Sequence, residues 1–254
     1  MEPATPEGRA RPAGRWIARV MEVLFPGLCR HCEAPLSGAP SPWFCGPCWD
    51  ALETPPGRVC HRCGVLLPEG VVADVAGWCC GPCVKRPPPF SLARAMGDYD
   101  GVPGAAVREL KFGRRTGVAR ALIGRLRPEC YPDALWEVDR VVPVPLHPGR
   151  LRERGFNQSG RLAHALGKRL GREVDQEGLK RVGPPVSQVG LSRKAREAAV
   201  KGAFVADPER VAGRRILLVD DVITTGATAR ACARALLKAG ARDVTVWAVA
   251  RRGG

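Results

Sequence analysis

Residues 215–229 read RILLVDDVITTGATA, and this stretch carries the fold prediction. Its apolar run, residues 216–219, predicts a buried strand, and residues 227–239 predict a helix that Gly240 closes. A second apolar run, residues 244–249, predicts another strand after the helix. A strand, a helix and a strand in this order join by a right-handed crossover, so the sequence predicts a parallel sheet in an α/β domain.

The turn between the predicted strand and helix has the composition of a phosphate site. Backbone N–H groups in a first helical turn lack intrahelical partners, and the helix dipole favours an anion there. Glycine allows close backbone approach and threonine hydroxyls add donors, so the candidate phosphate residues are Thr224, Thr225, Gly226, Ala227 and Thr228. The acid pair, Asp220 and Asp221, would repel a phosphate, but its carboxylates can accept hydrogen bonds from sugar hydroxyls or bind Mg²⁺. The stretch therefore predicts a ligand that carries a phosphate beside a diol or a metal ion.

Length and composition are those of a globular chain with room for one ordinary domain and a small one. The chain has 254 residues, of which 45% are apolar. No apolar run approaches the ~18–20 residues that span a bilayer, so we expect no membrane insertion. Residues 16–25 are interrupted by Arg19 and Glu22, and no small-residue cleavage site follows. They predict a short amphipathic helix at residues 15–24 of a cytoplasmic protein, and no signal peptide.

The charge balance is strongly basic, with a formal net charge of +15. Thiolates that bind zinc would reduce this value without reversing its sign. The excess of Lys and Arg over Asp and Glu is concentrated in residues 140–201. Such a concentration favours a polyanionic partner, either nucleic acid or a heavily phosphorylated small molecule. The alternative is a solvated surface rich in arginine.

Four Cys-x-x-Cys pairs occur in succession near the start of the chain: Cys29/Cys32, Cys45/Cys48, Cys60/Cys63 and Cys80/Cys83. Two residues between cysteines allow both sulfurs to reach one tetrahedral ion, so four pairs predict two Cys₄ zinc sites. Eight thiolate ligands leave no open coordination position, which indicates a structural role. Disulfides are disfavoured in a reducing cytosol. We expect sequential pairing, first with second and third with fourth; a cross-braced scheme is the alternative, and Cys79 is left over.

These patterns divide the chain into three regions. Residues 1–26 form a tail and short helix, residues 27–86 a double zinc ribbon, and residues 90–254 the α/β domain behind a proline-rich linker. Periodicity in the last region predicts strands at 93–99 and 140–144 and helices at 102–112, 116–126 and 157–170.

A second anion site is predicted where the strand at 140–144 runs into a basic segment. The candidate residues are Arg150, Arg152, Arg154, Asn157 and Gln158. Arginine forks bind the oxygens of a diphosphate bidentately, which suits such a site. The alternative is that the arginines are surface charges and that Asn157 caps a helix.

Residues 184–204 are polar, basic and weakly periodic, which predicts a long loop. A mobile lid would exclude water from a reaction at an activated sugar carbon. Its charged candidates are Gln188, Arg193, Lys194 and Arg196. The same residues could instead grip nucleic acid, and the sequence leaves both interpretations open.

The segment RILLVDDVITTGAT resembles the phosphoribosyl pyrophosphate (PRPP) motif of type I phosphoribosyltransferases. The cysteine-rich start, KRPPPF, LKF-G, RGFNQ, VGLSRKAR and VKGAF, taken with that motif, resemble the ComF family. The resemblance implies that Asp220 and Asp221 hold the ribose hydroxyls, often with Mg²⁺ nearby, and are the candidate catalytic residues. It implies further that residues 224–228 cradle the 5′-phosphate and that Lys111 brings a cation near the pyrophosphate. The ComF family is linked to DNA uptake in natural competence and is often described as amidophosphoribosyltransferase-like.

Two functions of different classes are therefore expected. The first is a glycosyltransferase that transfers phosphoribosyl from PRPP to an unknown nitrogen acceptor with Mg²⁺. The second is a non-catalytic, PRPP-responsive protein that binds single-stranded DNA, alone or with competence-machinery proteins. An aromatic content of 6% offers few stacking platforms for such a strand. The zinc region could also serve only for protein docking or stability.

Overall fold

The computed structural model describes residues 27–52, 58–67, 77–112, 117–182, 198 and 200–253, apart from the side chain of Phe112. The helix predicted at 15–24 lies outside these residues, and so do the four lid candidates Gln188, Arg193, Lys194 and Arg196. The chain divides into two compact units, residues 1–50 and 51–254, which are described separately below. The boundaries predicted for the zinc ribbon region stay a prediction.

The first unit is built around one pair of cysteine knuckles. Leu28 and Pro35 form an antiparallel bridge, which closes the first knuckle. The Ser41 hydroxyl accepts hydrogen bonds from the N–H groups of Trp43 and Phe44 at 3.1 and 3.3 Å. These bonds set the turn that leads into helix α2 (Gly46–Ala51), and Phe44 is fully buried beneath it. Most of the small core of this unit is therefore cysteine and one aromatic ring.

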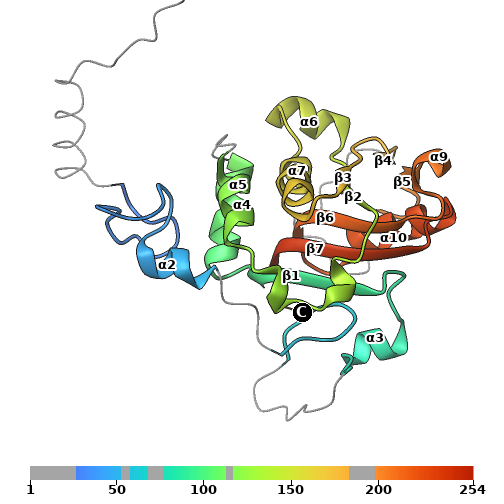
Figure 1. Cartoon of the computed structure of the whole chain (residues 1–254), viewed down its shortest axis with the longest axis horizontal. Coiled ribbons are helices and arrows are strands. Elements are labelled where there is room, and N and C mark those ends of the chain that lie inside the picture. The colour runs from blue at the N-terminus through green and yellow to red at the C-terminus, as the bar shows by residue number, and fades with distance from the viewer. Residues whose placement is uncertain are drawn as a thin grey trace, which may run out of the picture. The chain divides into compact units, whose positions relative to one another are not determined.

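A five-stranded parallel sheet organises the second unit (Figure 1). Its strand order is β1-β7-β6-β2-β3, and every neighbouring pair is parallel. The strands are β1 (Leu92–Asp98), β2 (Arg140–Pro143), β3 (Glu173–Val174), β6 (Arg215–Ile223) and β7 (Asp243–Arg251). The predicted crossover from β6 through a helix to β7 is present, and the predicted α/β fold class is confirmed.

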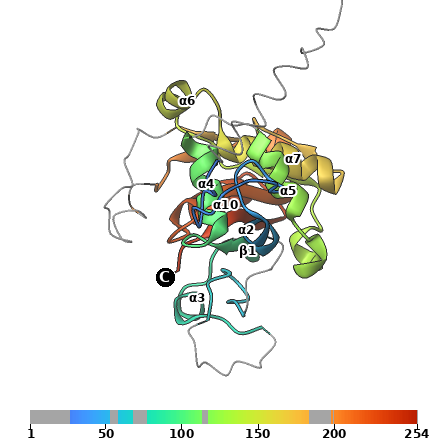
Figure 2. The same cartoon turned by 90° about the vertical axis from the view of Figure 1, so that its left-hand side faces the viewer.

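Helices cover both faces of this sheet (Figures 1 and 2). On one face, α4 (Val102–Phe112) packs against β1 and β7, and α7 (Gln158–Leu170) packs against β2 and β6. Between them lies α5 (Gly117–Arg125), which contacts both. The other face carries α10 (Ala227–Lys238). Alternate strand residues point to opposite faces, so each strand contributes side chains to both cores and reads as a nearly continuous apolar run.

Shorter elements complete the second unit. An antiparallel pair, β4 (Leu179–Arg181) and β5 (Phe204–Ala206), lies against α10. The remaining short helices are α3 (Gly81–Lys85), η1 (Pro128–Cys130), η2 (Asp133–Leu135), α6 (Pro148–Arg154) and α9 (Pro208–Val211). No described helix has the length and apolar character needed to cross a membrane.

Strand β6 is longer than the sequence predicts. The expected strand ends at residue 219, directly before the acid pair, but β6 continues through Asp220 and Asp221 to Ile223. The reason is the register with β7, which pairs Asp220 with Ala248 and Ile223 with Arg251. Strand β2, in contrast, pairs with β6 only as far as Val219. At the acid pair, β6 is therefore paired with β7 on one side only, because β2 has already ended.

Candidate functional site

The acid pair lies near the carboxyl end of β6, which is the edge where ligands bind in parallel α/β sheets. As adjacent strand residues, Asp220 and Asp221 point to opposite faces of the sheet. Each carboxylate consequently has different partners. Both residues are half-buried.

Asp220 is held by hydrogen bonds at one oxygen. Its Oδ1 atom accepts from the Ser159 hydroxyl at 3.1 Å and from the Asp221 N–H at 2.8 Å. Burial, together with the nearby charge of Asp221, raises the pKa of Asp220 to about 7. The Asp221 N–H, the Lys111 charge and Ser159 oppose this rise. A carboxyl group that titrates near neutrality is a functional-site signature.

Asp221 forms an ion pair with Lys111. The distance from Lys111 Nζ to Asp221 Oδ2 is 3.0 Å, and the two side chains are 23% and 14% exposed. Lys111 lies in the last turn of α4, so this contact fixes the end of that helix to β6. The family resemblance implies that Lys111 brings a cation near the pyrophosphate; in this structure its ion partner is Asp221.

The Thr/Gly turn connects β6 to α10. Gly226 caps the helix with a left-handed φ of 74°, a backbone conformation that residues with a side chain rarely adopt. The Thr225 hydroxyl accepts a bond from the Ala227 N–H at 3.4 Å. The segment from Thr224 to Thr228 thus presents hydroxyls and N–H groups at the start of a twelve-residue helix.

The second predicted anion segment begins where β2 ends. Asn157 caps α7: its Oδ1 accepts from the Ser159 N–H at 3.1 Å, and its Nδ2 donates to the Val144 carbonyl at 3.1 Å. Ser159 itself reaches Asp220, so the start of α7 lies beside the acid pair. Gln158 is 1% exposed, and its amide nitrogen and oxygen have no hydrogen-bond partner among the described residues. A buried amide without partners is unusual, and it leaves donor and acceptor atoms that water or a polar ligand can satisfy.

The three arginines of this segment lie on α6, which the sequence analysis missed. Arg150 and Arg154 are half-buried and Arg152 is exposed. The His147 ring caps this helix, with Nδ1 accepting from the Gly149 N–H at 3.0 Å, and Gly155 ends it with a φ of 78°. His147 is therefore the N-cap of α6. No described contact joins these arginines to the acid pair.

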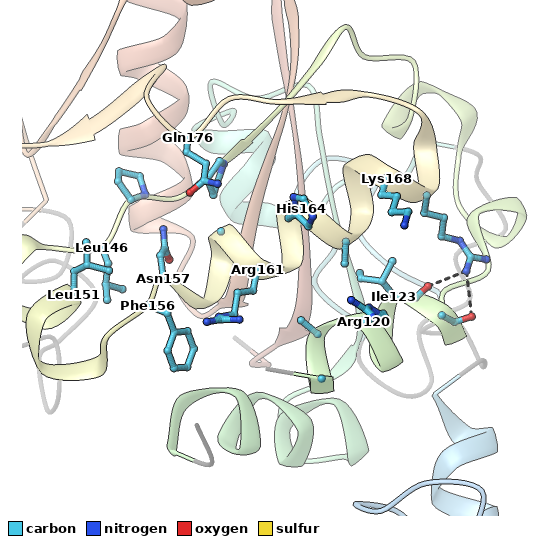
Figure 3. Close-up of a pocket in the computed structure, with 18 of the residues that line it drawn as sticks. Arg120, Ile123, Leu146, Leu151, Phe156, Asn157, Arg161, His164, Lys168 and Gln176 are labelled. Atoms are coloured by element: carbon cyan, nitrogen blue, oxygen red, sulfur yellow. Dashed lines mark hydrogen bonds between the residues drawn. The ribbon is translucent and has the colours of Figure 1, made fainter. Parts of the chain in front are cut away.

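A wide groove of about 1200 Å³ runs between α5, α7 and the loop after β2 (Figure 3). We call it the α5–α7 groove. Six charged or titratable side chains line it. Arg169 donates to the carbonyls of Ile123, Gly124 and Leu126, and Glu177 forms an ion pair with Lys180. The other four are Arg120, Arg161, His164 and Lys168. The Arg161 guanidinium lies 4.5 Å from the centre of the Phe156 ring. Within the described part of the chain, no carboxylate forms an ion pair with any of the four.

The eight paired cysteines form two groups: Cys29, Cys32, Cys45 and Cys48, and Cys60, Cys63, Cys80 and Cys83. Within each group the four sulfurs lie within 4.8 Å of one another. Tetrahedral zinc with Zn–S bonds of ~2.3 Å separates sulfurs by about 3.8 Å. The Cys32–Cys45 and Cys63–Cys80 separations, 3.5 and 3.7 Å, fit that geometry. Sequential pairing is confirmed, and Cys79 lies outside both groups.

Backbone N–H groups also prepare the cysteines for a cation. Burial alone would raise the pKa of Cys60, but the N–H groups of Cys63, Cys80 and Arg62 outweigh it and lower this pKa to about 6. One of these bonds runs from the Cys80 N–H to the Cys60 sulfur at 3.3 Å. Such N–H contacts stabilise the thiolate that a metal ion requires.

Sequence reasoning missed several residues of these sites. Ser159 follows the RGFNQ motif directly, but its contact with Asp220 spans 61 positions and leaves no local pattern. The groove residues Arg161 and Lys168 were counted only as part of a basic region. The available signal was the spacing of Arg161, His164 and Lys168. They are three and four residues apart, which places them on one face of α7.

The chain is similar to several known proteins. A family model described as phosphoribosyl transferase domain matches residues 158–254. The chain is 36% identical over 234 residues to DNA utilization protein YhgH of Escherichia coli, covering 90% of this chain and 99% of that protein. It is 31% identical over 238 residues to competence protein F of Haemophilus influenzae, covering 91% and 100%. Among solved structures it is similar to a glutamine PRPP amidotransferase from B. subtilis complexed with ADP and GMP, with 25% identity, a TM-score of 0.36, and coverage of 55% of this chain and 30% of that chain.

Proposed function

Because the chain belongs to the family that contains DNA utilization protein YhgH and competence protein F, we propose that it is a PRPP-binding phosphoribosyltransferase linked to DNA uptake. The phosphoribosyl transferase domain in its C-terminal part supports the class of ligand. The proposed reaction transfers phosphoribosyl to a nitrogen acceptor, in the cytoplasm and with Mg²⁺. The proposal does not specify which nitrogen compound is the acceptor.

The observation that carries this proposal is the convergence on the acid pair. The end of β6, the start of α7 through Ser159 and the end of α4 through Lys111 all meet there. The phosphate turn begins directly after β6 ends, three residues beyond Asp221. A ligand with a diol and a phosphate on one ring matches this arrangement.

The proposed roles follow the chemistry of each side chain. Asp220 and Asp221 accept hydrogen bonds from the ribose hydroxyls, and residues 224–228 donate to the 5′-phosphate. The diphosphate is bound by Lys111, Arg150, Arg152, Arg154, Asn157 and Gln158. Gln188, Arg193, Lys194 and Arg196 are proposed as lid residues.

The acid pair fits Mg²⁺ only in combination with substrate. It offers two carboxylates, and the groups of three or more metal ligands among the described residues are both cysteine sets. Mg²⁺ favours six oxygen ligands and commonly takes several from phosphates and water. The ion would therefore arrive with the diphosphate and neutralise its charge while Asp220 and Asp221 orient the ribose.

In the proposed transfer, a nitrogen lone pair forms a bond to the anomeric carbon of the ribose. The bond from that carbon to the diphosphate oxygen breaks, its electron pair leaves with the diphosphate, and the acceptor nitrogen loses a proton to water. No side chain becomes covalently attached, so the protein acts by orientation and charge.

Calorimetry of PRPP with Mg²⁺ tests the binding step. We expect the Asp220→Asn/Asp221→Asn variant to lose affinity, whereas Asp133→Asn, an exposed change on η2, should retain it. Ribose 5-phosphate and inorganic pyrophosphate as competitors separate the two anion segments. Equal PRPP affinity in wild type and the double variant would refute the site. Pyrophosphate release with a panel of nitrogen acceptors then tests transfer.

A second candidate function, binding of single-stranded DNA, is favoured by the α5–α7 groove. Its five basic side chains outnumber the one acid, Glu177, which suits a phosphate backbone, and Phe156 is the one Phe, Tyr or Trp among the described lining residues (Figure 3). Binding should therefore depend on charge more than on base stacking. Neutralised phosphates on single strands each contribute about −0.7 to the slope of log K against log salt.

Fluorescence anisotropy with an oligothymidine at several salt concentrations tests this candidate. Arg161→Glu/Lys168→Glu should weaken binding and flatten the slope by about 1.4, the contribution of two phosphates. The matched control is Arg234→Glu/Lys238→Glu, which makes the same charge change on exposed positions of α10. Equal losses in both variants would exclude the groove as the binding surface.

A further inference from the structure

The second cysteine group is part of the core of the phosphoribosyl transferase unit. Cys60, Cys63 and Cys83 belong to the same buried cluster as side chains from β2, β6, β7 and α10. They lie on the α10 face of the sheet, since the clustered strand residues, such as Leu218 and Val246, point to that face. This group therefore packs onto the sheet within the same compact unit.

Backbone contacts join this group to β1. The Ala93 N–H donates to the Arg62 carbonyl at 2.8 Å, inside the third knuckle. Gly64 follows with a φ of 68°, and a Cβ atom there would lie 2.5 Å from the Ala93 carbonyl oxygen. The knuckle can approach the strand so closely only because this residue is glycine.

Two guanidinium groups lie against the same cysteine group. Arg94 is 7% exposed, and its Nη1 atom donates to the carbonyls of Cys60, His61 and Ala93 at 3.4, 3.0 and 2.8 Å. Arg251 Nη2 lies 3.7 Å from the Cys63 sulfur. Neither arginine forms an ion pair with a carboxylate in the described ranges. Four thiolates with one divalent ion carry two net negative charges, so the loaded group supplies the counter-charge that these arginines otherwise lack.

Arg251 also adjoins the end of the strand that carries the acid pair. It is the register partner of Ile223, and the Arg252 N–H donates to the Ile223 carbonyl at 2.9 Å. Ile223 directly precedes the phosphate turn. On the far side of that turn, Arg230 Nη1 in the first stretch of α10 lies 3.4 Å from the Arg86 carbonyl, just after α3. Both ends of the turn are thus connected to segments that the second cysteine group holds.

We propose that metal loading of the second cysteine group sets the geometry of the phosphate turn, with Arg251 as the positioning residue that transmits it. Loss of the ion removes the counter-charge of Arg251, and a half-buried guanidinium without a partner is disfavoured. The end of β7 then loosens, and with it Ile223 and the turn. The first cysteine group, in the other compact unit, has no described link to the turn. The affinity part of this inference rests on the proposed PRPP function.

The test compares full-length variants that lose one metal each. Cys60→Ser/Cys63→Ser should bind one zinc fewer, exchange amide hydrogens faster at residues 223–228 and bind PRPP about tenfold more weakly. Cys29→Ser/Cys32→Ser should also lose one zinc, with exchange at the turn and PRPP affinity unchanged. Zinc is counted with a metallochromic dye, exchange by mass spectrometry and affinity by calorimetry.

Arg251→Met keeps all eight cysteine ligands. It therefore tests the coupling in a second variant, in case the cysteine variants misfold. We expect faster zinc release to a chelator and faster exchange at the turn, with Arg251→Lys restoring part of both. The control is Arg242→Met, an exposed arginine directly before β7. Unchanged exchange at the turn in both Arg251→Met and Cys60→Ser/Cys63→Ser would overturn the inference. If wild type binds no PRPP, the proposed function fails, and hydrogen exchange still decides on the coupling.

Discussion

Replacement of Asp220 by Asn should stabilise the protein at alkaline pH while it removes ligand binding. Asparagine keeps an oxygen that can accept the bonds from Ser159 and from the Asp221 N–H, so the local geometry is retained. It removes a carboxylate whose charge is disfavoured by burial and by Asp221. The free energy of unfolding should therefore rise.

The magnitude follows from the pKa of Asp220, which moves from 3.8 to about 7 on folding. At 1.36 kcal/mol per unit, the charged carboxylate costs the folded state at most about 4 kcal/mol. Because the folded pKa is the higher one, this cost grows as pH rises through the interval between the two values and is complete above pH 7. The gain in the variant should grow by about 2 kcal/mol between pH 5.5 and pH 8.

Urea unfolding at pH 5.5 and pH 8 measures this difference, with wild type and variant compared at each pH so that effects on the zinc sites cancel. Asp139→Asn is a control of opposite sign. The Arg215 N–H lowers the pKa of Asp139, so its stabilising contribution is complete above 3.8 and its loss should be constant over this range. A gain at Asp220 that does not change with pH, or a loss at pH 8, would refute the reasoning.

Three further outcomes are expected. PRPP affinity with Mg²⁺ should rise about tenfold from pH 6 to pH 8 in calorimetry, because Asp220 ionises near pH 7, and a flat profile would contradict this role. Gly226→Ala should lower the unfolding free energy by about 1 kcal/mol or more because its φ is positive. Gly124→Ala, at an exposed position of α5, should instead raise it by about 0.5–1 kcal/mol in thermal melts. Gln158→Met should leave stability unchanged or higher, since an unpartnered amide is removed, yet weaken PRPP binding; a stability loss above about 2 kcal/mol would show that the amide has a structural partner.

Elements with a strong local pattern were predictable from sequence. Helix α4 has the predicted bounds 102–112, and α7 begins one residue after the predicted start because Asn157 is its cap. The prediction failed where tertiary contacts override local preference. Asp220 and Asp221 read as the end of a strand because acids are rare in strands, but the register with β7 extends β6 beyond them. Helix α6 was missed because its seven residues are rich in arginine and have no buried face.

The candidate site also has parts that a local sequence pattern predicts and parts that depend on tertiary contacts. The phosphate turn and the acid pair are contiguous, so one motif predicts them together, although their role in PRPP binding stays a prediction. Cysteine spacing likewise predicted two groups of four sulfurs, but the structure was needed to choose sequential over cross-braced pairing. Spacing says nothing of the surface on which a knuckle rests, so the contacts of the second cysteine group with Arg94 and Arg251 had no signal in the sequence.

The strand order has a consequence for synthesis of the chain on the ribosome. Strand β1 lies at one edge of the sheet, and its strand neighbour is β7, about 150 residues later in the chain. At ~5–20 residues per second, β1 waits roughly 8–30 s for that partner. During this interval its apolar side chains, Leu92 and Met96 among them, lack the strand that later pairs with them. The nascent chain, more than the finished protein, is therefore the form in which this sheet edge invites aggregation.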